Sequence, residues 1–123
     1  MRMGIALVFM LGLTAGAAAE PNEDLMDLTQ GLWSLAGEGE QGCDITLGDR
    51  PAKEGARVID DAGDCRNVIP GMSSATAWRI EEPGTLVFLS DTGKVLLKLQ
   101  HDQAQGEFRA DDQGQTLVMS PLD

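Results

Sequence analysis

Two neighbouring stretches, Gly31–Leu35 (GLWSL) and Cys43–Leu47 (CDITL), decide the fold of this 123-residue chain. In both stretches every second residue is apolar, beginning with Trp33 in the first and Cys43 in the second. This period of two gives each segment one apolar face, as in a half-buried β-strand. The segment 36–42 between them is rich in Gly and charged residues and indicates a loop. The two stretches therefore predict an antiparallel hairpin.

The rest of the chain repeats this plan of short apolar runs between turns. The runs cover 56–59, 76–80, 86–89, 94–99, 106–110 and 115–119, and Cys65 opens one further short stretch, 65–69; Gly, Asp or Pro lie between them. In 76–80 Trp78 and Ile80 share one face, and in 94–99 Val95, Leu97 and Leu99 are expected to face inward. Seven or eight short strands in series predict an antiparallel sandwich or barrel. A barrel is favoured because closure removes exposed strand edges in so small a domain.

Residues 1–19 have the pattern of a secretory signal peptide. Arg2 precedes an apolar core, and 15–19 ends in an Ala-x-Ala cleavage pattern. The alternative, a membrane anchor, needs about 20 strongly apolar residues. Cleavage after Ala19 would start the mature chain at Glu20. No Cys adjoins the cut, which disfavours a lipid anchor and membrane insertion after cleavage.

The composition limits the partners that the chain can have. The chain has 9 basic and 20 acidic residues, and loss of the leader removes only Arg2, so the mature net charge is near −12. Such a surface repels nucleic acid and anionic membranes and attracts basic partners. In an exported chain the two cysteines, Cys43 and Cys65, predict one disulfide. A zinc site is disfavoured because His101 is the only histidine and no Cys-x-x-Cys is present.

The predicted mature chain begins with a polar segment, Glu20–Asp24, which we expect to be exposed and mobile. Asn22 can cap a short helix that runs from Glu23 to about Thr29. At helical spacing, Leu25 and Leu28 would then face the body of the domain.

No residue pattern indicates catalysis. His101 lies among polar residues and is interpreted as a solvated loop residue. The adjacent acids at 60–61, 81–82 and 111–112 lie beside turns, where carboxylates are mostly solvated. No glycine loop of the phosphate-binding kind follows a strand. Trp33 and Trp78 are interpreted as core residues. We therefore predict neither an enzyme, nor a metal site, nor a cofactor.

An ordered set of residues resembles a known family. The set is Leu28, Gly31-x-Trp33-x-Leu35, Cys43-Asp44-Ile45-x-Leu47, Cys65, Trp78, Gly84-x-Leu86 and Leu89-x-Asp91-x-Gly93. It is similar to the alkaline proteinase inhibitor (Inh) family of bacterial periplasmic metalloprotease inhibitors, whose domain also occurs in outer-membrane lipoproteins. The likeness covers about residues 25–119, nearly the whole predicted mature chain.

The resemblance implies a small eight-stranded antiparallel β-barrel over 25–123, with a short N-terminal helix and a Cys43–Cys65 disulfide. It also implies a periplasmic, monomeric inhibitor of secreted serralysin-type zinc proteases. In such inhibitors the mature N-terminus enters the active-site cleft, and by position that segment is Glu20, Pro21, Asn22, Glu23 and Asp24. The well-known members begin with small, Ser-like residues, whereas this segment begins Glu-Pro.

Two other classes of function stay open. A lipocalin- or avidin-like carrier would use an internal apolar cavity of a few hundred Å³. An inhibitor would instead have a barrel filled by Trp33, Trp78 and aliphatic side chains. An envelope interaction domain with a target other than a protease, such as the basic enzyme lysozyme, is the second alternative.

Overall fold

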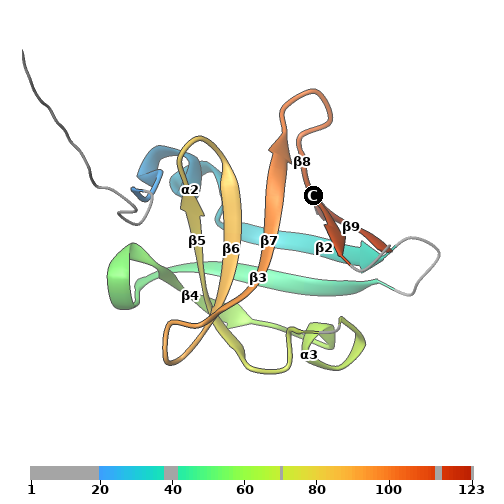
Figure 1. Ribbon diagram of the computed structural model, residues 1–123, viewed down its shortest axis with the longest axis horizontal. Helices are drawn as coiled ribbons and strands as arrows, with labels where there is room; N and C mark the ends of the chain where they lie inside the picture. The colour runs from blue at the N-terminus through green and yellow to red at the C-terminus, as the bar shows by residue number, and fades with distance from the viewer. Residues whose placement is uncertain (1–19, 38–41, 70, 113–114, 123) are drawn as a thin grey trace, which may run out of the picture.

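The computed structural model describes residues 20–37, 42–69, 71–112 and 115–122, so the predicted signal peptide lies outside the described residues. A short helix comes first, and strands follow to the end of the chain (Figure 1). The elements are α2 (Glu23–Thr29), β2 (Gly31–Gly37), β3 (Cys43–Pro51), the 3₁₀ turn η1 (Lys53–Gly55), β4 (Arg57–Asp61), α3 (Cys65–Val68), β5 (Ala75–Glu81), β6 (Thr85–Ser90), β7 (Val95–Asp102), β8 (Glu107–Asp112) and β9 (Gln115–Pro121).

The eight strands form one closed antiparallel barrel, as predicted, and the structure shows that they follow one another around it in sequence order. β2 pairs with β9 to close it, with Leu35 opposite Met119. In Figure 1, β2 and β3 run across the molecule, and β5, β6 and β7 run upright across their direction. The predicted hairpin is confirmed, because Trp33 pairs with Ile45 and Leu35 with Cys43. Its loop, 38–41, lies outside the described residues.

Side chains fill the barrel interior. Trp78, Phe88 and Ile80 are fully buried, and they pack in one cluster with residues from every strand and from α2. Trp33 is 8% exposed, and its ring meets Phe108 edge-on at 5.7 Å between centroids. The buried N–H groups of both indoles donate hydrogen bonds, as buried polar groups generally do. Trp33 Nε1 donates to the Thr29 carbonyl at 2.6 Å and Trp78 Nε1 to the Gly48 carbonyl at 3.0 Å.

The predicted disulfide is confirmed. Cys43 at the start of β3 is bonded to Cys65, with 5.2 Å between their Cα atoms. The bond attaches the connection between β4 and β5 to the barrel wall. The stretch that Cys65 opens, for which the sequence predicted no particular element, is the short helix α3. Cys65 and Ile69 are both buried four residues apart, which is helical spacing.

Two other expectations about side-chain direction were wrong. Val95 is 44% exposed, because the register between β6 and β7 shifts at this point. The extra residue of a bulge turns the strand, so Leu96 packs on the core in place of Val95. Leu28 is 82% exposed, and α2 buries Met26 and Thr29 instead. The Asn22 cap fixes where this seven-residue helix begins, and so which of its residues face the barrel.

Candidate functional site

The N-terminal segment lies against the end of β5 rather than projecting freely from the barrel. The Asn22 N–H donates to the Ile80 carbonyl at 2.6 Å, and the Glu82 N–H donates to the Glu20 carbonyl at 3.0 Å. Pro21 is paired with Glu81 in an antiparallel bridge between these two bonds. Residues 20–22 thus form a short strand-like extension that pairs with residues 80–82 at the end of β5.

Asn22 joins this segment to the helix, as predicted from the sequence. Its Oδ1 accepts the Leu25 N–H at 3.1 Å, which caps α2. Its Nδ2 lies 3.4 Å from both the Glu82 Oε2 and the Pro83 carbonyl oxygen. Glu23 and Asp24 occupy the first helical turn, where negative charge is favourable. The predicted protease-binding residues therefore divide into a strand-like part, 20–22, and a helical part, 23–24.

The 3₁₀ turn η1 closes over the segment from the other side. A Cβ built on Gly55 would lie 2.6 Å from Cγ of Pro21, so only glycine permits this approach. Gly55 also has φ +77°, a left-handed conformation that side chains disfavour. Pro21 is half-buried between β5 and η1, while Glu20, Glu23 and Asp24 are exposed. The five residues are brought together at one end of the barrel, and their role in protease binding stays a prediction.

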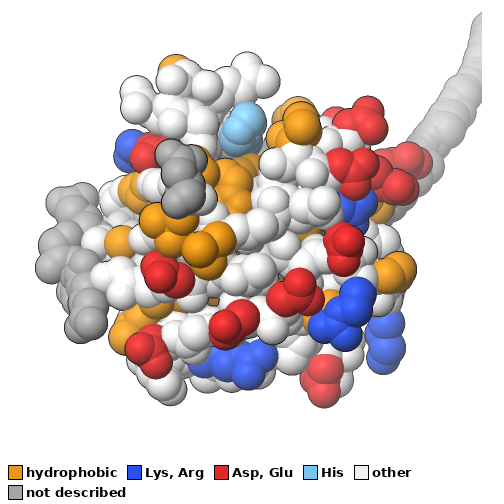
Figure 2. All heavy atoms as spheres, turned by 180° about the vertical axis from the view of Figure 1, so that it is seen from behind, with side chains coloured by type: hydrophobic (Ala, Val, Ile, Leu, Met, Phe, Trp, Pro, Cys, Tyr) orange, Lys and Arg blue, Asp and Glu red, His pale blue; other side chains and the backbone are white. Residues whose placement is uncertain are grey.

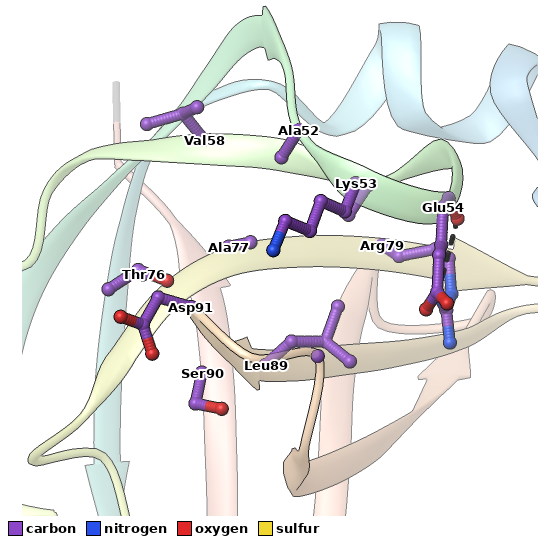
Figure 3. A pocket seen from close by; sticks show the side chains of 12 residues that line it. Ala52, Lys53, Glu54, Val58, Thr76, Ala77, Arg79, Leu89, Ser90 and Asp91 are labelled. Carbon is purple, nitrogen blue, oxygen red and sulfur yellow. Dashed lines mark hydrogen bonds between the residues drawn. The ribbon is translucent and has the colours of Figure 1, made fainter.

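An apolar groove of about 290 Å³ lies next to this segment, on the outside of β4, β5 and β6 (Figure 3). Ala56, Ala77 and Leu89 form its floor and are 3–7% exposed. Outward positions of a barrel are usually polar, so burial of three apolar residues here indicates a covered surface. The alternation pattern had marked only the inward face, and sequence reasoning did not identify this groove.

Arg79 links the groove to the N-terminal segment. Its Nη2 contacts Glu81 Oε2 at 2.6 Å, and the two side chains are 11% and 14% exposed. Its Nη1 donates to the carbonyl of Glu54 at 3.3 Å. Glu54 has φ +57°, uncommon for a residue with a side chain, and this bond helps to hold it there. Arg79 thereby fastens η1 to β5 between the groove and Pro21.

The residues weighed for catalysis do not converge. His101 is half-buried, and its ring lies 4.8 Å from that of Phe108. In the described part of the chain no three His, Cys, Asp or Glu side chains are placed to hold a metal ion. Within the same residues, no helix is long and apolar enough to cross a membrane. Figure 2 shows acidic side chains spread over one face, with hydrophobic ones grouped among them.

Comparison with known proteins gives two findings. The family model described as "Protease inhibitor Inh" matches residues 24–121. The crystal structure titled as that of a psychrophilic marine protease MP inhibitor superimposes with a TM-score of 0.59 at 19% sequence identity. That match covers 79% of this chain and 98% of the other. None of the curated proteins matches the sequence. At this identity the structural likeness is one of fold.

Proposed function

The chain belongs to the protease inhibitor Inh family, and we propose that it inhibits secreted serralysin-type zinc metalloproteases in the periplasm. In this proposal the predicted mature N-terminus, Glu20, enters the active-site cleft, and the end of the barrel around α2 and η1 covers the entrance. The protein acts as a monomer and by occupation of the cleft, without catalysis of its own. Export through the signal peptide at 1–19 would bring it to the periplasm.

The observation that carries the proposal is the attachment of the N-terminal segment to the barrel. Two backbone hydrogen bonds and the Asn22 cap hold residues 20–22 in one conformation. A segment that is already ordered loses less conformational entropy on binding, which strengthens association. The exposed Glu20 offers an α-amine and a carboxylate, both of which can ligate zinc. Pro21, which has no N–H and a fixed φ, would resist cleavage as a substrate.

The filled interior supports an inhibitor over a small-molecule carrier. Carriers with this architecture hold their ligand inside the barrel, in a cavity lined by apolar side chains. Here the large side chains of Trp78, Phe88 and Phe108 occupy the interior with at most 1% exposure. The hollow described above lies outside the barrel wall.

The test is a titration of a secreted serralysin-type metalloprotease with the chain beginning at Glu20. We expect loss of proteolysis with an end point at one inhibitor per enzyme. Lysozyme and a secreted serine protease serve as parallel targets. Inhibition of lysozyme alone would support the envelope domain with another target, and inhibition of none at micromolar protein would refute the proposal.

A further inference from the structure

The groove beside η1 is an outer apolar surface that the fold only partly covers. Ala56, Ala77, Val87 and Leu89 form a second buried cluster, separate from the cluster inside the barrel. The cover comes from η1, which Arg79 holds against β5. Over the middle of the groove, this cover is the side chain of Lys53 (Figure 3).

Lys53 shows what the groove can hold. Its alkyl stem extends from η1 across the mouth of the groove above Ala77, and its ammonium group points toward the side of Asp91 and Thr76 (Figure 3). Among the described residues, no carboxylate lies within 4.0 Å of this ammonium group. The stem therefore rests on apolar surface while the charge stays in water, as long cationic side chains commonly do. An unbranched alkylammonium chain thus fits the groove.

The charges around the groove favour a cation. Glu54 and Asp91 both line it, and neither carboxylate takes part in an ion pair within the described residues. The guanidinium of Arg79 is already paired with Glu81. The chain as a whole carries a formal charge of −11, which disfavours anionic ligands further.

We propose that the groove takes up the side chain of a surface lysine of the partner protein, in place of Lys53. The alkyl stem would lie over Ala77 and Leu89, with the ammonium group on the side of Asp91, where that of Lys53 points. That this partner is a protease rests on the proposed function. The positions agree, because Glu81, which pairs with Arg79 in the groove wall, is also bridged to Pro21. A protein bound to the N-terminal segment would therefore lie close to the groove.

The direct test is NMR titration of the chain beginning at Glu20 with Nα-acetyl-lysine N-methylamide. The neutral norleucine analogue, hexanoate and the free diamine cadaverine are the comparison ligands. We expect the lysine derivative to bind most tightly and to shift the resonances of Ala52, Ala77 and Leu89. Replacing one exposed charge changes an interaction by about 0.2–1 kcal/mol, so Asp91→Asn should weaken binding about threefold.

Lys53→Ala removes the competing side chain and should strengthen binding about threefold, while Lys98→Ala, the same change on the outside of β7, should not. Equal or tighter binding of the norleucine analogue or hexanoate would overturn the cation preference. Tighter binding of cadaverine would overturn the protein side chain as occupant, and absence of shifts at the three reporters would overturn the site.

The partner is tested separately. If the protein inhibits a serralysin-type enzyme, Asp91→Asn should raise its inhibition constant about threefold, and an unchanged constant would overturn the groove as part of that interface. If the lysine derivative binds but the protein inhibits no such enzyme, the protease fails as the partner while the lysine site stands.

Discussion

Asn22→Ala tests whether the N-terminal segment owes its position to the helix cap. The substitution removes the acceptor for the Leu25 N–H and the weak, exposed contacts of Nδ2 with Glu82 and Pro83. Loss of an N-cap costs about 1 kcal/mol, and long exposed contacts add little. We therefore expect a loss of about 1–1.5 kcal/mol in the free energy of unfolding. In a domain of about 100 residues this lowers Tm by roughly 4–8 °C per kcal/mol.

The assay is urea unfolding followed by tryptophan fluorescence, with two matched variants. Asn67→Ala makes the same change on the exposed surface of α3 and should leave stability within about 0.5 kcal/mol of the parent. Asn22→Ser keeps a capping oxygen but removes the Nδ2 donor, and it should retain most of the stability. Equal stability of Asn22→Ala and Asn67→Ala would refute the cap. A loss in Asn22→Ser as large as in Asn22→Ala would show that the Nδ2 contacts, and not the cap, stabilise the segment.

The remaining predictions concern the scaffold. Replacing Cys43 and Cys65 together by Ala should lower the free energy of unfolding by roughly 3 kcal/mol, since the bond closes a loop with a sequence separation of 22; an unchanged urea midpoint would contradict this. Trp78→Phe should cost about 2–4 kcal/mol, because it removes the indole donor to the buried Gly48 carbonyl and opens a cavity, whereas less than 1 kcal/mol would refute that hydrogen bond. Gly55→Ala should destabilise by more than 1 kcal/mol through its positive φ and its clash with Pro21, and Pro21→Gly in the same chain should recover the part due to the clash; a neutral Gly55→Ala would count against this packing.

The barrel itself was predictable from the sequence, because period-two alternation and turn residues act over a few positions. Trp33 and Leu35 in β2 and Trp78 in β5 face inward as that pattern requires. The Cys43–Cys65 pair followed from the presence of two cysteines in a chain predicted to be exported. The residue patterns predicted the wrong side-chain direction where contacts between distant parts of the chain determine it. The bulge at β7 turns Val95 outward, and Leu28 in α2 faces solvent instead of the barrel.

The site was predicted less completely than the fold. The cap at Asn22 was visible from the residue types, but the bonds from Glu20 and Asn22 to β5 join residues about 60 positions apart. No local pattern reports such a contact. The groove also depends on contacts between residues distant in the sequence. Ala56 and Ala77 are small residues on outward faces, and they become the floor of a groove only when η1 folds over them. The period-two alternation of the sequence does not distinguish them from ordinary surface alanines.

In the function proposed above, the N-terminus at Glu20 enters the cleft of a secreted serralysin-type zinc protease. The most direct measurement compares inhibition by the chain beginning at Glu20 with inhibition by the same chain preceded by Gly-Ser. The added residues leave the bonds of residues 20–22 to β5 intact but move the α-amine outward. We predict one-to-one inhibition by the first protein and a large loss of inhibition with the second. Equal inhibition by both would contradict insertion of the N-terminus and would move the contact surface to the barrel.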